Sequence, residues 1–255
     1  MIKLLAAIAN IVFLAPFILL LVARPAYAIA GHAPPAALWA ARPIVMVVDQ
    51  DGDLCTGTAL AHDLVLTAAH CVIRPVRYRV KEFQTGVSIP VHSIVRHPHF
   101  NARAYAESRA TADLALIKLG RALPSIVVPA ALGAARRVKA GETLTIAGFG
   151  TTAAFTNRGL GVPRMATLAV TGRPGSLQIR LVDGKTRNLH AGLGACTGDS
   201  GGPAYDGLGP LLIGVVSWTT GPDNSEGCGG LTGLTPLIAY RSWIIDTARK
   251  FGRHL

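Results

Sequence analysis

The chain has 255 residues, of which half are hydrophobic and only 15% are charged; this excludes a disordered protein and suits one all-β domain or a two-lobed one. Its formal net charge is +11, but the basic residues are scattered, without a long basic run and without interleaved aromatic residues. We therefore expect a solvated basic surface and no nucleic-acid partner.

The first 28 residues are expected to be a signal peptide. Residues 4–23 are almost wholly apolar, and the small-residue pattern AYA follows at residues 26–28. This pattern predicts cleavage after Ala28, a mature domain over residues 29–255, and a secreted or periplasmic location. About 20 apolar residues could also span a membrane. A retained anchor is therefore the alternative, and only that alternative implies contact with a membrane.

Short apolar runs between turn residues predict a series of β-strands. Such runs lie at residues 43–48, 63–69, 113–119, 143–150, 166–171, 177–182 and 211–218. Their number and spacing favour a sandwich or barrel rather than alternating strands and helices. Residues 30–42 are expected to cross the surface. Residues 239–251 carry apolar side chains at helical spacing, so we expect an all-β fold with a C-terminal α-helix.

Four cysteines are present in the chain, and an even number on an exported protein suggests two disulfides. Their spacing allows three pairings and does not choose between them. It is also too wide for a CxxC zinc or redox motif. The four are Cys55, Cys71, Cys196 and Cys228.

The sequence GDSGGP at residues 198–203 places Ser200 within a GxSxG pattern. In an α/β hydrolase this pattern would be followed by a helix, and then by an acid and a histidine. Pro203 opposes a helix here, and His254 at the chain end is the only later histidine. The α/β-hydrolase interpretation therefore fails.

The opposite order, histidine, aspartate, serine, is present. His70 ends the stretch LTAAH and Asp113 begins the apolar run DLALIKL. A serine hydroxyl needs a base to become a nucleophile, and the base needs an acid that orients it. With these stretches the sequence resembles the trypsin/chymotrypsin family of serine endopeptidases over residues 29–245.

This resemblance implies two six-stranded antiparallel β-barrels with the active site in the cleft between them, and we place the lobe boundary near residues 130–142. His70 would be the general base, Asp113 its orienting acid, and Ser200 the nucleophile that forms an acyl-enzyme. The backbone N–H groups of Gly198 and Ser200 would form the oxyanion hole.

The resemblance also implies the disulfide pairs, Cys55 with Cys71 and Cys196 with Cys228. We expect a polypeptide substrate, a monomer, and neither cofactor nor metal; a group of histidines lacks a nearby acid (His92, His97 and His99). The alternative function is a protease-fold homologue that acts as a binding module without catalysis. The presence of all three triad residues argues against it.

The residue six positions before the nucleophile lies at the base of the specificity pocket in this family, and here it is the uncharged Gly194. Selection of Lys or Arg at P1, the residue before the scissile bond, is therefore not expected. The substrate-binding strand would be formed by Ser217, Trp218 and Thr219. Thr219 narrows the slot, and the opposite wall is either Thr232 or Gly233. We expect a preference for small aliphatic P1 residues.

In this family a freed amino terminus beginning with Ile or Val pairs with the aspartate beside the nucleophile. Here these residues would be Ile29 and Asp199. No basic activation site precedes Ile29, so signal peptidase itself would expose the activating terminus. The alternative is that the mature chain starts elsewhere and that other donors satisfy Asp199.

Overall fold

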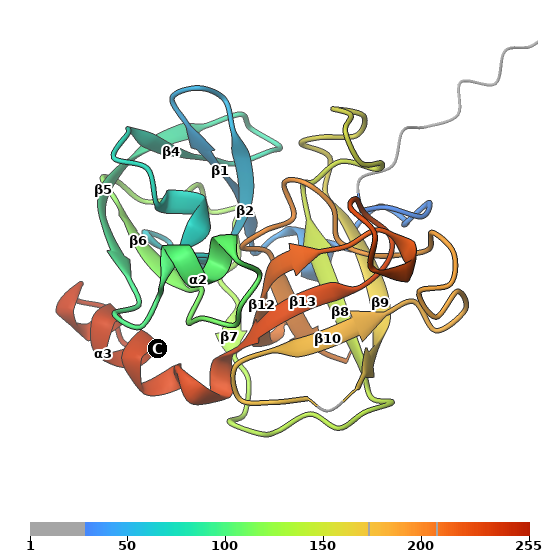
Figure 1. Ribbon diagram of the computed structural model, residues 1–255. Coiled ribbons are helices and arrows are strands. Elements are labelled where there is room, and N and C mark those ends of the chain that lie inside the picture. Colours follow the sequence, from blue (N-terminus) through green and yellow to red (C-terminus); the bar gives the residue numbers. More distant parts are fainter. Residues whose placement is uncertain (1–28, 173, 208) are drawn as a thin grey trace, which may run out of the picture.

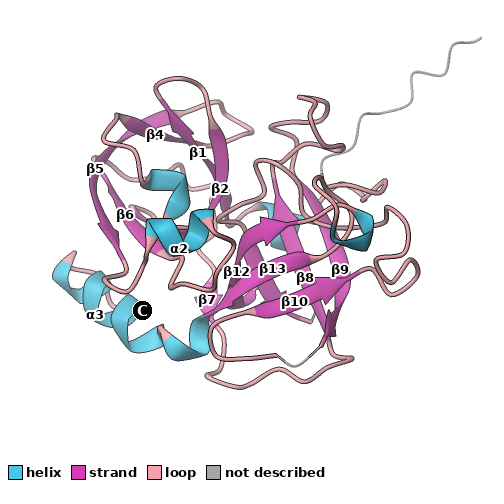
Figure 2. Cartoon of the chain, viewed as in Figure 1, coloured by secondary structure: helices cyan, strands magenta, loops and turns pink. Residues whose placement is uncertain are grey.

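Two β-barrels lie side by side and a C-terminal helix packs against the first (Figure 1). The computed structural model describes residues 29–172, 174–207 and 209–255, so the predicted signal peptide lies outside the described residues. Strands dominate both barrels (Figure 2), which confirms the expected all-β fold with a C-terminal helix. Within the described ranges, no helix has the length and apolar character needed to cross a membrane.

The first barrel closes six antiparallel strands in the order β1-β2-β3-β6-β5-β4. Side chains along a strand point alternately into and out of the barrel. In β4, Tyr78 and Val80 are buried, whereas Arg79 and Lys81 are exposed. The strands are β1 (Ile44–Asp49), β2 (Leu54–Ala61), β3 (Leu64–Thr67), β4 (Tyr78–Lys81), β5 (Ser88–Arg96) and β6 (Ala115–Leu119).

The second barrel closes in the order β11-β8-β9-β10-β13-β12, because β12 pairs with β11 as well as with β13. A short outer strand, β7 (Ala131–Leu132), pairs in parallel with β12. The barrel strands are β8 (Thr143–Gly148), β9 (Arg164–Thr171), β10 (Ile179–Val182), β11 (Pro203–Asp206), β12 (Leu211–Thr219) and β13 (Thr232–Pro236).

The helices are few and short. The predicted C-terminal helix is α3 (Arg241–Lys250), and α2 (Ala102–Ala106) begins after Asn101, whose side chain accepts the Ala104 N–H at 2.9 Å. Residues 30–42 do cross from one barrel to the other, but they bury several alanines and include α1 (Leu38–Ala41). The single turns are η1 (His70–Val72), η2 (Pro222–Asn224) and η3 (Leu237–Ala239).

Each terminal segment fastens one barrel to the other. Near the N-terminus, Ala30 pairs with Gly194 of the second barrel before the chain enters the first barrel. After the second barrel, α3 returns to pack against β6. Between the barrels lies an apolar core with members from both and from α3, including Phe149, Tyr205 and Ile244, all fully buried. This core fixes the relative position of the two barrels.

We predict that Asp63 stabilises the attachment of the C-terminus to the first barrel. The guanidinium of Arg253 and the ammonium group of Lys118 both form ion pairs with its carboxylate. The hydrogen bond from Arg253, and to a smaller extent that from Lys118, lowers the pKa of Asp63 to about 2. Because the folded-state pKa lies below the unfolded value, this stability is present above pH 4 and is lost as the pH falls towards 2. Asp63→Asn should cost about 1–2 kcal/mol at pH 6, measured by urea unfolding.

The cost should shrink at pH 2.5, where wild-type Asp63 also begins to gain a proton. The matched control is Asp246→Asn, which removes an exposed ion pair with Arg249. An equal effect of both substitutions at pH 6 would contradict the prediction.

Candidate active site

A buried carboxylate holds the histidine singled out by the sequence. His70 opens η1 after β3, and Asp113 precedes β6, the strand that pairs with β3. Asp113 is 1% exposed; its Oδ1 accepts the His70 backbone N–H at 2.9 Å, and its Oδ2 lies 2.7 Å from His70 Nδ1. The Ser217 hydroxyl donates to the same Oδ2 at 2.6 Å. With Nδ1 held by the carboxylate, Nε2 is the nitrogen left for proton transfer.

Ser200 reaches this pair across the barrel interface through a tight turn. Gly198 and Gly201 on either side of it have positive φ angles of 96° and 82°, and a Cβ at Gly201 would lie 2.1 Å from Thr67 Oγ1. The Ser200 carbonyl accepts the Thr56 N–H of β2 at 2.8 Å. The loop of the second barrel that carries Ser200 is therefore docked directly on the first barrel.

One disulfide sulfur lies beside both His70 and Ser200. Cys71 Sγ is 3.6 Å from the Ser200 carbonyl oxygen and 3.7 Å from His70 Nε2. Among the described residues, no hydrogen bond joins Ser200 Oγ to His70. Catalytic hydrogen bonds are often long without substrate and shorten in the substrate complex. The structure thus brings the three predicted triad residues to one place, with the His70–Asp113 contact formed.

Two backbone N–H groups beside Ser200 point to a site for negative charge. In the described part of the chain, the N–H groups of Gly198 and Ser200 donate to no protein acceptor. The residue between them differs, because the Asp199 N–H donates to the Cys196 carbonyl at 3.0 Å. The Gly198 carbonyl is held by the Thr56 hydroxyl at 2.8 Å. Two free donors on a fixed loop are suited to stabilising an oxyanion.

Asp199 is a second buried carboxylate, 1% exposed, on the inner side of this loop. Its Oδ1 accepts the Gly150 N–H and its Oδ2 the Cys196 N–H, both at 2.8 Å. Burial nevertheless raises the pKa of Asp199 to about 7. A Cβ at Gly148 would lie 2.1 Å from its Oδ1, and one at Gly150 would lie 2.5 Å from its Cγ. The glycines form a close cradle that costs the ionised form much of its solvation.

Ile29 is fully buried in the core of the same barrel. The next residue, Ala30, donates its N–H to the Gly194 carbonyl at 3.0 Å. A Cβ at Gly31 would lie 2.3 Å from the Gly192 backbone. The start of the predicted mature domain is therefore inserted beside the segment that leads to Asp199.

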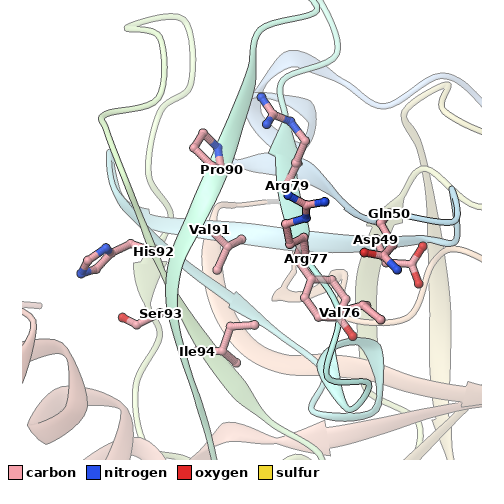
Figure 3. Close-up of a pocket in the computed structure, with 11 residues that line it drawn as sticks. Asp49, Gln50, Val76, Arg77, Arg79, Pro90, Val91, His92, Ser93 and Ile94 are labelled. Carbon is pink, nitrogen blue, oxygen red and sulfur yellow. The ribbon is translucent and has the colours of Figure 1, made fainter.

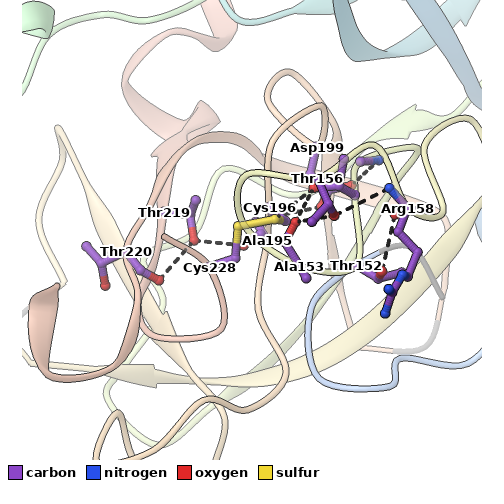
Figure 4. The surroundings of a disulfide bond; sticks show 12 residues. Thr152, Ala153, Thr156, Arg158, Ala195, Cys196, Asp199, Thr219, Thr220 and Cys228 are labelled. Carbon is purple, nitrogen blue, oxygen red and sulfur yellow. Dashed lines mark hydrogen bonds between the residues drawn. A yellow bond between two sulfur atoms is a disulfide. The ribbon is translucent and has the colours of Figure 1, made fainter. Parts of the chain in front are cut away.

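The predicted specificity pocket is narrowed by two threonines. The Thr219 hydroxyl donates to the Ala195 carbonyl at 2.7 Å, across the slot, beside the Cys196–Cys228 disulfide (Figure 4). The Thr232 hydroxyl accepts the Ala195 N–H at 2.9 Å. A Cβ at Gly194 would lie 3.4 Å from that hydroxyl. Thr232 thus faces Gly194, the predicted base of the pocket.

Gly233, the other candidate for the pocket wall, has a different place. A Cβ there would lie 1.9 Å from the Trp218 indole. Gly233 therefore allows Trp218 to lie flat against β13. Thr232, and not Gly233, is therefore the residue that faces the predicted pocket base at Gly194.

The two disulfides are Cys55–Cys71 and Cys196–Cys228, the pairs that the resemblance implied. The first closes the loop that carries His70. The two sulfur atoms and His70 lie close enough together to hold a metal ion. The sulfurs are joined in a disulfide, however, and are therefore not available as thiolate ligands. His97 is buried against Tyr240 and Trp243, at ring distances of 4.9 and 4.8 Å, which gives it a packing role.

Sequence reasoning missed two residues at this site, Thr56 of the barrel contact described above and Tyr105. The Tyr105 ring stacks on the His70 imidazole, with centroids 4.4 Å apart. Its hydroxyl donates to the Ser217 carbonyl at 3.2 Å. The N-cap signal of Asn101 could have indicated α2, but no local pattern indicates that Tyr105 reaches His70.

A separate hollow of about 570 Å³ lies on the outer face of the first barrel, between β4 and β5 (Figure 3). It is lined by Arg77, Arg79, Pro90 and Ile94 among others, and by none of the triad residues.

Comparison with known proteins places these features in one family. A family model described as Trypsin matches residues 29–244. Trypsin epsilon of Drosophila erecta is 30% identical over 224 residues, covering 77% of this chain and 78% of the relative. Serine protease 1 of Canis lupus familiaris is 28% identical over 213 residues, covering 76% and 79%.

Solved structures share the fold. Human heparin binding protein aligns with a TM-score of 0.67 at 21% identity, covering 86% of this chain and 96% of that one. Neuropsin from mouse brain aligns with a TM-score of 0.68 at 23% identity, covering 85% and 98%.

Proposed function

The chain belongs to the trypsin family and is a serine endopeptidase that acts on polypeptides, and from this premise we propose how its residues perform the reaction. His70, Asp113 and Ser200 are the catalytic triad, and the N–H groups of Gly198 and Ser200 form the oxyanion hole. The observation that supports this most strongly is the buried Asp113 carboxylate, bonded to His70 next to the nucleophile loop.

In the proposed reaction, His70 Nε2 takes the Ser200 hydroxyl proton as Oγ attacks the substrate carbonyl carbon. The carbonyl oxygen gains the negative charge and is held by the two free N–H groups. Asp113 stabilises the imidazolium without taking its proton. His70 then protonates the leaving amine, which gives the acyl-enzyme. A water molecule, deprotonated by His70, hydrolyses the acyl-enzyme and restores Ser200.

The proposed P1 preference is for small aliphatic residues such as Ala or Val. Support comes from Thr219 and Thr232, whose hydroxyls contact the Ala195 backbone and narrow the slot above Gly194. The uncharged Gly194 offers nothing to pair with Lys or Arg. A long P1 side chain would have to break the Thr219 hydrogen bond. If that side chain is Lys or Arg, its charge would also be left unpaired.

We also propose that processing activates the protein. Cleavage after Ala28 would free the Ile29 ammonium group to pair with Asp199, whose buried carboxylate otherwise has only two N–H donors in the described structure. The insertion of residues 29–31 beside Gly194 supports this pairing. Export and activation would then be one event. The paired carboxylate would fix the loop that carries Gly198 and Ser200.

The proposed location is outside the cytoplasm, either periplasmic or extracellular, because two disulfides favour an oxidising compartment. We propose a signal peptide over residues 1–28 and a monomeric protease domain over residues 29–255, with its lobe boundary near residues 130–142.

Loss of the nucleophile should abolish hydrolysis and leave the fold intact. We expect Ser200→Ala and His70→Ala each to lower kcat by several orders of magnitude, because the triad acts as a unit. A fluorophosphonate probe should label wild type at Ser200 and should not label Ser200→Ala. Unfolding curves serve as the control. A folded wild-type protein of the Ile29 form that resists the probe would instead favour the binding-module alternative.

The P1 preference can be tested with chromogenic peptides that differ only at P1. Wild type should cleave after Ala or Val faster than after Phe or Arg. Thr219→Gly should raise kcat/KM for P1 Phe by about tenfold or more relative to P1 Ala, because it removes the side chain that crosses the slot. Faster wild-type cleavage after Arg than after Ala would refute the proposal.

The Asp199 proposal predicts that the pH dependence of stability differs between two forms, one that starts at Ile29 and one with Gly-Ser before it. In the extended form the raised Asp199 pKa makes the folded state hold a proton more tightly than the unfolded state. Stability should therefore fall as the pH rises from about 4 to 7, by on the order of 4 kcal/mol in total. Urea unfolding at pH 5 and pH 7.5 measures this slope.

The Ile29 form should lack most of this slope and should have the higher kcat. Asp199→Asn in the extended form is the matched control, because it removes the titrating group while keeping its size. Equal kcat and equal pH slopes in the two forms would rule the mechanism out.

A further inference from the structure

The Cys55–Cys71 disulfide and His70 form a compact group of potential metal ligands. Both Sγ atoms and a ring nitrogen of His70 lie within 4.8 Å of one another. Within the part of the chain that the structure describes, no other three histidine, cysteine or acidic side chains lie so close together. All three residues are half-buried, so a small solute can reach them from the solvent.

The distance between His70 and one of the sulfurs already suits a zinc ion. Cys71 Sγ is 3.7 Å from His70 Nε2. With Zn–S and Zn–N bonds of ordinary length, a sulfur and a nitrogen on one tetrahedral ion lie about 3.6 Å apart. Two thiolates on one ion lie about 3.8 Å apart. Cysteines whose Cα atoms are 6.1 Å apart can reach that separation by rotating their side chains.

The buried Asp113 carboxylate orients the histidine as a metal site requires. A histidine bound to a metal usually donates its other ring N–H to a carboxylate, which fixes the ring and makes the ligating nitrogen more basic. Here Asp113 Oδ2 lies 2.7 Å from His70 Nδ1, and Asp113 Oδ1 accepts the His70 backbone N–H. The contact that prepares Nε2 for proton transfer therefore also prepares it for metal binding.

The disulfide keeps this group from binding an ion, because the ligand that a metal requires is the cysteine thiolate. His70 alone supplies one of the four ligands of a zinc site. A small dithiol would change this: it gives two electrons and two protons to the sulfurs, becomes a disulfide itself, and leaves Cys55 and Cys71 as thiols. A zinc ion that binds them then releases both thiol protons to the solvent.

We propose that reduction of Cys55–Cys71 creates an inhibitory zinc site formed by both thiolates and His70 Nε2. Three protein ligands leave the fourth position of the ion for water. The ion takes the nitrogen lone pair that accepts the Ser200 proton in the proposed reaction, so the zinc-bound protein is inert. The disulfide thus protects the general base from metal ions. The inhibition rests on the proposed function, whereas the metal site itself does not.

The test uses the Ile29 form with Cys196→Ser and Cys228→Ser, in which Cys55–Cys71 is the remaining disulfide. The protein is reduced with dithiothreitol, which is then removed without oxygen, and Co²⁺ is added as a spectroscopic substitute for zinc. We expect thiolate-to-cobalt charge-transfer absorption that zinc abolishes by displacement. Zinc should also lower kcat and the rate of fluorophosphonate labelling by about tenfold or more, and a chelator should restore both. The same protein before reduction should show none of these effects.

The matched control carries Cys55→Ser and Cys71→Ser and keeps Cys196–Cys228 as its disulfide. After reduction it should bind Co²⁺ at least about tenfold more weakly, and zinc should not inhibit it, because its two thiols lack the histidine. Asp113→Asn in the test protein should weaken Co²⁺ binding by about 10–100-fold, a measurement that does not require catalysis.

If reduction alone unfolds the test protein, zinc should raise its midpoint in urea, because an ion bound only by the folded state stabilises that state. Suppose that the oxidised protein is active and labelled, and that the reduced protein shows neither charge-transfer absorption nor a higher midpoint with zinc. This result would overturn the metal site and leave the proposed function intact. Metal binding to a reduced protein whose oxidised form is neither active nor labelled would overturn the proposed function and the inhibition, but not the site.

Discussion

The site depends on one buried threonine that joins the two barrels. Thr56 of β2 is fully buried; its N–H donates to the Ser200 carbonyl and its hydroxyl donates to the Gly198 carbonyl. The same hydroxyl accepts the Phe149 N–H at 3.1 Å. His70 and Asp113 belong to the first barrel and Ser200 to the second, so their separation is set by this contact. An unsatisfied partner in such a buried network typically costs about 1–3 kcal/mol, and this cost fixes the register of the loop.

A second constraint acts on the opposite side of the same loop. Asp199 is buried against Gly148 and Gly150. A Cβ atom at either glycine would clash with the Asp199 carboxyl group, so that the backbone packs directly against it. Two N–H donors offset only part of the lost solvation, as the raised pKa of Asp199 indicates. The loop that carries Ser200 is thus held by a satisfied network at Thr56 and adjoins a carboxyl group at Asp199 whose ionised form is poorly stabilised. In the proposed activation, a single ammonium group at Ile29 would supply the charge that stabilises this carboxylate.

Much of the architecture followed from the sequence. Each of the seven apolar runs overlaps a strand, and the stretches around His70, Asp113 and Ser200 are distinctive enough to place them together. Six of the described strands lie outside these runs (β2, β4, β5, β7, β11 and β13); in β4, for example, apolar and charged side chains alternate over only four residues and give a weak signal. The choice between Thr232 and Gly233 stayed open since a shift of one residue reverses which side chain faces the slot. Only the pairing of β12 with β13 decides it.

The contacts that were missed are those that no local pattern encodes. Tyr105 reaches His70 because a five-residue helix happens to end over the cleft, which depends on how the loop between β5 and β6 packs. This contact and the Asp199 charge act on different parts of the proposed reaction. Asp199 lies behind Gly198 and Ser200, so its neutralisation bears on the oxyanion hole and hence on kcat. Tyr105 instead contacts His70 and the Ser217 carbonyl, so it bears on the His70–Asp113 pair rather than on the loop that carries Ser200. Under the proposed activation, processing would make the change at Asp199 once for each molecule.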